Sequence, residues 1–111
     1  MKKLEKKIYE VKNPNGTDTA MVSTVLFIKS ALHNQKLNAN GQAEGFSMED
    51  VIIRVNIDKA VSGLSKDIIF EEEEAKALIQ MVKDTRWATF DEALSDFFQC
   101  IQNMETYDIN A

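Results

Sequence analysis

Apolar residues recur at helical spacing over much of the chain, and the first such stretch begins near residue 19. Its apolar positions follow one another at steps of four, three and four: Met21, Val25, Ile28 and Leu32. This spacing predicts a helix over about residues 19–35. The β-branched residues at 22–25 leave a second interpretation open, in which residues 17–24 form a hairpin strand before the helix starts. We favour the longer helix.

The segment 48–61 carries a stronger local start signal. Ser47 is followed three residues later by Asp50, a variant of the capping box in which the serine oxygen accepts from unpaired amides. A helix here places four apolar residues on one side: Ile53, Ile57, Ala60 and Leu64. Apolar residues also occupy alternate positions over residues 51–57, which is typical of a strand: Val51, Ile53, Val55 and Ile57. Because of the cap signal, we favour the helix.

The C-terminal half of the chain predicts a short strand followed by two helices. Asp67 to Phe70 is an apolar run of strand type. A helical stripe follows it: Ala75, Leu78, Ile79 and Val82. Thr89 and Glu92 then form a capping box for a last helix. The apolar stripe of that helix repeats at four, three, four and three: Phe90, Leu94, Phe97, Ile101 and Met104.

A second strand is predicted near the N-terminus. Residues 5–12 alternate around apolar positions and run into a turn at 13–16, where proline and glycine stand. Since a two-stranded sheet is not stable alone in water, we expect residues 6–11 to pair with 67–70 and to rest on the helices. The predicted fold is α+β and mainly helical, with about four helices packed on a short two-stranded antiparallel sheet in the order β-α-α-β-α-α.

The length and composition are those of one globular domain: 111 residues, 44% of them hydrophobic and 28% charged. We expect the domain to span residues 1–105, with a loose C-terminal tail at 106–111. No stretch approaches the roughly 18 apolar residues of a membrane span, and no signal-peptide core follows the basic start. Cys100 is the only cysteine, which excludes an intrachain disulfide. These features favour a reduced, cytoplasmic setting.

Four consecutive glutamates, Glu71 to Glu74, are the most conspicuous charged feature. They fall at the start of a predicted helix, where unpaired amides and the helix dipole favour carboxylates by about 0.3–1 kcal/mol each. Because consecutive helical residues point in different directions, the four cannot converge on one metal ion without a second acidic element. We interpret them as a solvated helix start. The formal net charge of −5 argues against a nucleic-acid backbone as the main ligand.

No group of residues in the sequence predicts catalysis, a metal site or a cofactor. His33 is the only histidine and stands at a predicted helix end, which is typical of a surface or capping residue. Cys100 lies in a helix rich in apolar residues, where we expect a buried, inert thiol. One cysteine and one histidine cannot supply the three or four ligands of a zinc site. The glycines lack the spacing of a phosphate-binding loop.

Arg86 and Trp87 lie in the connection between the last two predicted helices. Trp87 either covers the core where the helices join or is an exposed anchor for a partner, since tryptophan and arginine are enriched where binding energy concentrates. Phe98 follows Phe97, and neighbours on a helix cannot face the same way, so one of the two is expected to meet a second subunit. The candidate interaction residues are therefore Arg86, Trp87 and Phe98, and we expect a homodimer.

In chain order the sequence has a short predicted strand, an NG turn and then three patterned segments: TVLFIKSALHN, IRVNIDKAV and DIIFEEEEAKALIQMV. This layout resembles small uncharacterised accessory proteins encoded by bacteriophages and prophages. The resemblance consists of patterned apolar positions over most of the chain. It implies a setting inside a bacterial host cell and carries no catalytic residues over to this sequence.

Together, the pattern and the resemblance favour a non-enzymatic accessory protein that binds a host or phage protein. Inhibition of a host defence, an adaptor role and help in virion assembly all fit. An alternative is a small-ligand or nucleotide-binding protein that sequesters its ligand at a dimer interface, with cations from Lys29, Lys36 and Arg54. A third hypothesis, an acidic mimic of nucleic acid, has little support from a net charge of −5.

Overall fold

The computed structural model describes residues 1–12, 19–34, 39–87 and 91–106. Its elements in chain order are β1 (Lys2–Glu5), β2 (Ile8–Lys12), β3 (Thr19–Ser23), α1 (Thr24–Leu32), α2 (Met48–Val61), β4 (Asp67–Phe70), α3 (Glu72–Asp84), α4 (Glu92–Gln102) and β5 (Glu105–Thr106). Over these residues the fold is α+β with four helices, as the sequence predicts. The order of the elements and the make-up of the sheets differ from the prediction.

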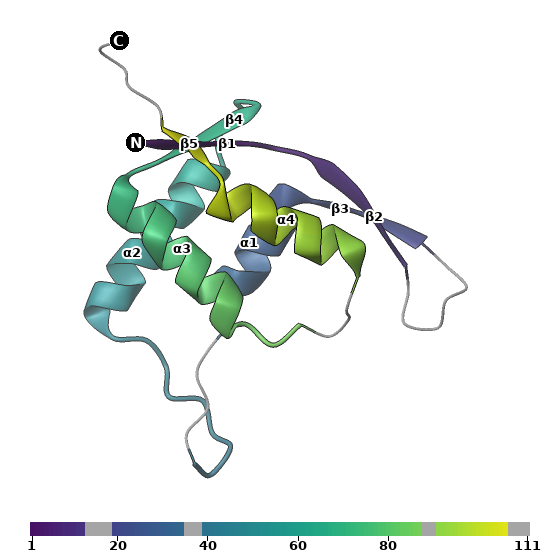
Figure 1. Ribbon diagram of the computed structural model, residues 1–111. Helices are drawn as coiled ribbons and strands as arrows, with labels where there is room; N and C mark the ends of the chain where they lie inside the picture. The colour runs from purple at the N-terminus through teal and green to yellow at the C-terminus, as the bar shows by residue number, and fades with distance from the viewer. Residues whose placement is uncertain (13–18, 35–38, 88–90, 107–111) are drawn as a thin grey trace.

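The strands form two small antiparallel sheets. β1 lies between β4 and β5 in the first sheet, and β2 pairs with β3 in the second. In Figure 1 the strands run along the top of the molecule and the helices lie below them, so the fold has one layer of strands on one layer of helices. The β2–β3 ribbon extends sideways beyond the helices (Figure 1).

Alternation along β1 and β4 directs their apolar residues toward the helices. Leu4 pairs with Ile68 in the register of the two strands, and both side chains are buried. Phe70, two residues further along β4, lies on the same face and is completely buried. Successive residues of a strand point to opposite faces. The first sheet therefore presents one apolar face to the helices.

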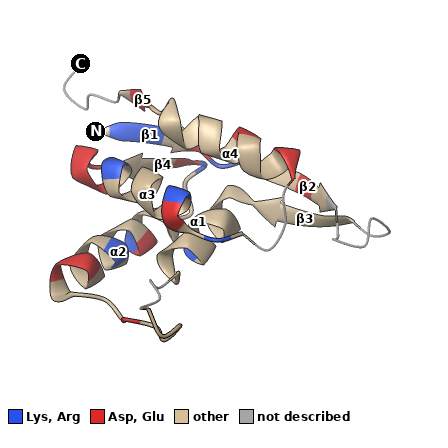
Figure 2. Cartoon of the chain, turned by 60° about the horizontal axis from the view of Figure 1, so that its bottom comes forward, with Lys and Arg blue, Asp and Glu red and all other residues tan. Residues whose placement is uncertain are grey.

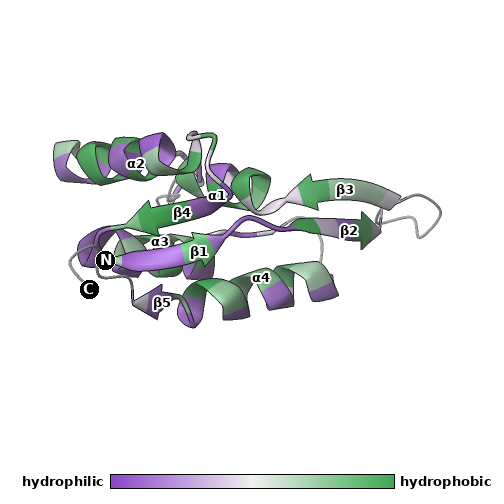
Figure 3. Cartoon of the chain, turned by 90° about the horizontal axis from the view of Figure 1, so that it is seen from above, coloured by the Kyte–Doolittle hydropathy of each residue, from purple (hydrophilic) through white to green (hydrophobic). Residues whose placement is uncertain are grey.

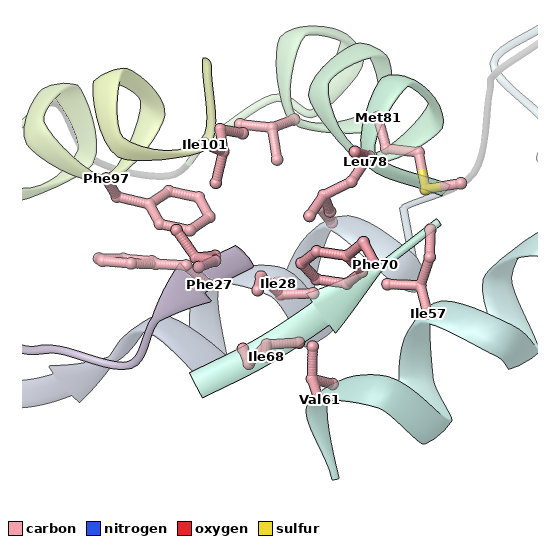
Figure 4. Close-up of a cluster of buried hydrophobic side chains, with 14 of the residues drawn as sticks. Phe27, Ile28, Ile57, Val61, Ile68, Phe70, Leu78, Met81, Phe97 and Ile101 are labelled. Atoms are coloured by element: carbon pink, nitrogen blue, oxygen red, sulfur yellow. The ribbon is translucent and has the colours of Figure 1, made fainter. Parts of the chain in front are cut away.

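The core collects side chains from every helix and from the first sheet. Figure 4 shows them converging: Phe27 and Ile28 from α1, Ile57 and Val61 from α2, Ile68 and Phe70 from β4, Leu78 and Met81 from α3, and Phe97 and Ile101 from α4. All ten are buried. Each helix thus uses one apolar stripe for this core, as its spacing predicts.

The helix predicted over residues 19–35 is wrong at its start, and the alternative of a strand is confirmed for residues 19–23. This segment pairs with β2 as β3, so its β-branched residues stand in a sheet. α1 begins only at Thr24, because the Ser23 hydroxyl accepts a hydrogen bond from the Leu26 N–H at 3.2 Å and caps the helix. The helix ends at Leu32.

The predicted pairing of residues 6–11 with 67–70 is also wrong. The strand expected at 5–12 is broken in two, so that β1 (Lys2–Glu5) pairs with β4 and β2 (Ile8–Lys12) pairs with β3. β2 pairs with β3, the strand that follows it in the chain, so β1 is the strand that pairs with β4. The loose tail predicted at 106–111 is wrong at its first residue, because Thr106 belongs to β5 and pairs with Lys2.

α2 confirms the interpretation of residues 51–57 as helix. The Ser47 hydroxyl accepts from the Asp50 N–H at 3.2 Å, as the cap signal predicts. Ile57 is buried and Ile53 packs against the core. The prediction for Leu64 is wrong, because the helix ends at Val61 and Leu64 is fully exposed beyond it.

The two C-terminal helices start at local caps. The Glu71 N–H donates to the Glu74 carboxylate at 3.0 Å, so the glutamate run begins α3 as interpreted. α4 begins later than predicted, because the Asp91 side chain caps it by accepting from the Ala93 N–H at 2.9 Å. Thr89 and Phe90, expected in that cap and stripe, lie outside the described residues.

Candidate functional site

Two of the three residues predicted for interaction line one hollow between the end of α3 and α4. The hollow has a volume of about 280 Å³, and its lining residues are Val82, Lys83, Trp87, Leu94, Ser95 and Phe98. Arg86 is exposed beside Trp87 in the chain but does not line it. Most of the lining side chains are apolar, so the hollow suits an apolar group.

Trp87 is held in place by its contacts with the core. Its indole Nε1 donates a hydrogen bond to the Val82 carbonyl oxygen at 3.3 Å. Its ring meets that of Phe27 edge-on, with centroids 6.0 Å apart and planes at 87°. The side chain is half-buried, so it covers the core where the helices join and still offers part of its surface to the hollow.

Local structure explains why these residues meet. α3 ends at Asp84, and Thr85 takes an extended backbone conformation while its hydroxyl donates to the Met81 carbonyl oxygen at 2.7 Å. The chain then turns, so that Trp87 lies over the last turn of α3. Leu94 and Phe98 are four residues apart on α4 and therefore share one face of it. Those two side chains form the opposite wall of the hollow.

The two adjacent phenylalanines of α4 both pack within this chain. Phe97 is completely buried, with its ring centroid 5.1 Å from that of Phe27. Phe98 is half-buried against the same core and lines the hollow. The two side chains do face different ways, but neither stands free on the surface. This pair of residues therefore does not by itself place a second subunit on α4.

The charged residue in the lining of the hollow is a cation. Lys83 lines the hollow and is exposed, and Arg86 is exposed close by in the chain. Within the part of the chain that the structure describes, neither side chain makes an ion pair. Both cations are therefore available to a carboxylate that approaches from outside.

A second cluster, formed by Lys7, Tyr9 and Cys100, lies where β2 meets α4. The Cys100 sulfur is 3.5 Å from the Lys7 Nζ and 3.9 Å from the Tyr9 hydroxyl oxygen. The expectation of a buried, inert thiol is therefore corrected, because Cys100 is only half-buried and has polar neighbours. Lys7 and Tyr9 are more than 90 positions away from Cys100 in the chain, so no local pattern in the sequence predicts these contacts.

This cluster changes the titration of two of its members. The hydrogen bond to Cys100 and the Coulombic interaction with that side chain raise the pKa of Lys7, with smaller contributions from Asp96 and Glu5. Burial raises the pKa of the Tyr9 phenol well above its ordinary value, and Cys100 and Asp96 add to the effect. Tyr9 and Lys7 thus both keep their protons to higher pH in the folded protein.

The cavity beside this cluster mixes charges of both signs. Its volume is about 530 Å³. The charged residues that line it are Lys3, Glu5, Lys7, Asp67, Asp96 and Glu105. Lys3 lies 3.9 Å from the Glu105 carboxylate, so part of this charge is already paired. Four carboxylates and two ammonium groups line the cavity, so its charge is negative on balance and does not favour an anion.

The cations proposed for a nucleotide site are engaged elsewhere in the structure. Arg54 Nη1 donates to the carbonyl oxygens of Ala31 and Leu32 at the end of α1. Its Nε lies 3.1 Å from Asp50 Oδ1, although the N–H does not point at that oxygen, so this contact is ionic. The Lys29 ammonium lies 4.0 Å from the Asp58 carboxylate. Lys36 lies outside the described residues.

His33 is exposed and ends α1, where its backbone N–H bonds to carbonyl oxygens of that helix. Among the described residues, no three side chains of the histidine, cysteine, aspartate and glutamate types gather as a metal site. Every helix in the described ranges falls short of the length and apolar character that a membrane crossing requires.

Three lining residues are not among the predicted interaction residues: Lys83, Leu94 and Ser95. Leu94 is predicted only as part of the apolar stripe of the last helix. A signal was present on the last helix, because Leu94 and Phe98 are spaced four residues apart and therefore share a face. Which face of α4 turns toward Trp87 depends on how the helices pack, and the spacing alone does not give it.

Comparisons of this chain with protein-family profiles, with curated proteins and with solved structures found no match.

Proposed function

We propose that this chain is a non-enzymatic accessory protein of phage type that binds another protein through the hollow between α3 and α4. The observation that carries the proposal is the meeting of Trp87 and Phe98 in one apolar hollow. Aromatic anchors in such concave places are where binding energy concentrates in protein interfaces. The phage setting rests on the resemblance of the three quoted segments.

The size of the hollow favours a side chain over a small molecule. A volume of about 280 Å³ falls at or below the roughly 300–1,000 Å³ typical of small-molecule sites. One large apolar side chain of a partner fits such a space. Burial of a side chain of this kind contributes about 1.5–3 kcal/mol.

The charge near the hollow indicates what should flank that side chain. Lys83 and Arg86 are exposed cations that make no ion pair within the described residues. Charge complementarity favours a partner segment with a carboxylate beside its apolar anchor. The occupant proposed is therefore a segment of a different protein that carries a large apolar residue next to an acidic one.

A random-peptide display selection against the purified protein tests this proposal. We expect the enriched peptides to share a large apolar residue beside an aspartate or glutamate. Trp87 is the only tryptophan, so titration of a selected peptide should change its fluorescence. Peptides without a common apolar and acidic pair, or binding without any effect on Trp87, would contradict the proposal.

Matched variants locate the binding. Ser95→Phe fills the hollow from an exposed position on α4 and should weaken the peptide at least about tenfold, or about 1.4 kcal/mol. Gln102→Phe introduces the same side chain on α4 outside the hollow and should change nothing. Lys83→Glu should shift the selection toward peptides with basic flanks. Equal binding by Ser95→Phe and Gln102→Phe would mean that the peptide binds elsewhere.

The gene's neighbours test the phage setting separately. Tail genes on either side would support a role in virion assembly. Genes of defence and counter-defence would support inhibition of a host protein. A chromosomal operon of metabolic genes would remove support for the phage setting but would leave the binding hollow to be judged by the peptide experiment.

A further inference from the structure

α2 is apolar on two opposite sides, and only one of them is used by the core. Ile57 and Val61 are buried and face the other helices. On the far side, Met48, Ile52 and Val55 are exposed by 71%, 54% and 45%. In a helix of 3.6 residues per turn, positions 48, 52 and 55 fall in one row. We call these three residues the outer row of α2.

The position of α2 leaves this row open. Figure 3 shows α2 along the margin of the molecule, away from the β2–β3 ribbon and α4, with hydrophobic colour interrupted by hydrophilic colour. α2 contacts α1, α3 and β4 through its inner side. A helix with apolar stripes on two sides normally has neighbours on two sides. Of the outer row, Val55 belongs to the alternating pattern that made residues 51–57 ambiguous in the sequence.

We propose that the outer row is a dimer interface, on which a second copy of this chain packs its own α2 antiparallel to the first. The spacing of four and three residues is that of a seam between two packed helices. A two-fold axis between residues 53 and 54 sets Ile52 of each copy against Val55 of the other. Ile52 and Val55 then each have an apolar counterpart, while Met48 of each copy faces Lys59 of the other.

The charges at the two ends of the row select this orientation. Lys59 continues the row by four residues, and Glu49 lies beside Met48 at the opposite end. Figure 2 shows the acidic colour at the end where α2 begins. The antiparallel arrangement brings Lys59 of each copy to Met48 and Glu49 of the other, where the lysine stem covers the methionine and the ammonium meets the carboxylate. A parallel arrangement would set like charges together.

The size of the row predicts how strong the dimer is. α2 has 14 residues and is therefore about 21 Å long. An interface made of one pair of such helices buries a surface area at the low end of the range for protein interfaces, below roughly 1,200 Å². The dimer is therefore weak and depends on concentration. It leaves the hollow at Trp87 free, since that hollow lies on α3 and α4.

Sedimentation equilibrium over a range of concentrations tests the proposal. The wild-type protein should pass from monomer to dimer, and Lys59→Glu or Glu49→Lys should weaken the dimer at least tenfold. The double variant Lys59→Glu with Glu49→Lys should restore it to within about threefold, because the ion pair is re-formed with reversed signs. Lys76→Glu and Glu73→Lys make the same changes of charge on α3 and should have no effect. Circular dichroism checks that each variant is folded.

Cysteine cross-linking tests the orientation in a Cys100→Ser background. Antiparallel packing places the two Met48 positions about 16 Å apart along the axis but sets each beside Lys59 of the other copy. A mixture of Met48→Cys and Lys59→Cys proteins should therefore form a heterodisulfide, and neither protein alone should cross-link, since disulfides need Cα atoms about 4.4–6.8 Å apart. A monomer at every concentration, a dimer indifferent to Lys59→Glu, or cross-linking of Met48→Cys with itself would overturn the proposal.

Discussion

Thr24 satisfies both backbone hydrogen-bonding groups of Lys7. The Lys7 N–H donates to the Thr24 hydroxyl oxygen at 2.9 Å, and the Lys7 carbonyl oxygen accepts from the Thr24 N–H at 2.9 Å and from its hydroxyl at 3.3 Å. Lys6, just before it, still donates from its N–H to the Lys66 carbonyl oxygen at 2.9 Å. The chain therefore leaves one sheet and enters the other at Lys7, and Thr24 replaces the missing strand partner there.

The hydroxyl of Thr24 should be required for stability. Thr24→Val keeps the shape of the side chain but removes the buried hydroxyl, so the Lys7 N–H loses its acceptor in a partly buried hydrogen bond. Loss of a hydrogen bond typically costs about 0.5–1.5 kcal/mol, so the free energy of unfolding should fall by that amount in urea denaturation. Thr24→Ser keeps the hydroxyl and should lose less. Equal stability of the valine and serine variants would contradict this account of the break between β1 and β2.

Arg54 should stabilise the packing of α2 on α1. Its guanidinium donates to the carbonyl oxygens of Ala31 and Leu32 in the last turn of α1 and stacks 4.3 Å over the Phe46 ring. Arg54→Met should lower the free energy of unfolding by about 1–3 kcal/mol in urea denaturation. Lys29→Met removes a more exposed cation with one carboxylate at 4.0 Å and should cost less than about 1 kcal/mol. A larger loss for Lys29→Met would refute the assignment.

Tyr9 should make the folded state less stable in strong alkali. Burial and the contact with Cys100 raise its pKa above the ordinary value of 10.0, so the unfolded chain releases this proton at lower pH than the folded protein does. The contribution to stability is complete below pH 10 and is lost as the pH rises beyond it. Tyr9→Phe removes this contribution, so its free energy of unfolding should fall less steeply between pH 9 and pH 11.

Lys7 serves as an internal reference for the experiment with Tyr9→Phe. The raised pKa of Lys7 has the same sign of effect, because the folded protein also holds this proton to higher pH. Some alkaline loss of stability should therefore remain in Tyr9→Phe. If the wild type and Tyr9→Phe lost stability in parallel over this range, the phenol would not be the group that titrates.

Within the glutamate run, Glu74 should matter most for stability. Its carboxylate accepts from the Glu71 N–H at 3.0 Å and closes the start of α3. Glu74→Ala should lower the free energy of unfolding by about 0.5–2 kcal/mol, the usual range for loss of a cap. Glu73→Ala, at an exposed position, should lose less, since only the dipole interaction is removed. Thermal unfolding followed by circular dichroism compares the two variants.

The candidate hollow was foreseen only in part. Trp87 and Phe98 stood out because of their residue types, and the structure brings them together. The same ground predicts Arg86, yet that residue lies outside the lining. The contacts of Cys100 with Lys7 and Tyr9 were not foreseen, because they join residues more than 90 positions apart and no local pattern reports such a meeting.

The sequence by itself determined the helices whose signals are local. Ser47 starts α2 and the glutamates start α3, because a cap acts between residues three apart and an apolar stripe repeats within a few turns. Only the tertiary structure decided which strands pair. Residues 2–5 pair with residues 67–70, which are about sixty positions away in the chain. Residues 19–23 form a strand because they can pair with β2. Strand pairing satisfies backbone groups through distant partners, so the fold as a whole chooses among segments of similar local preference.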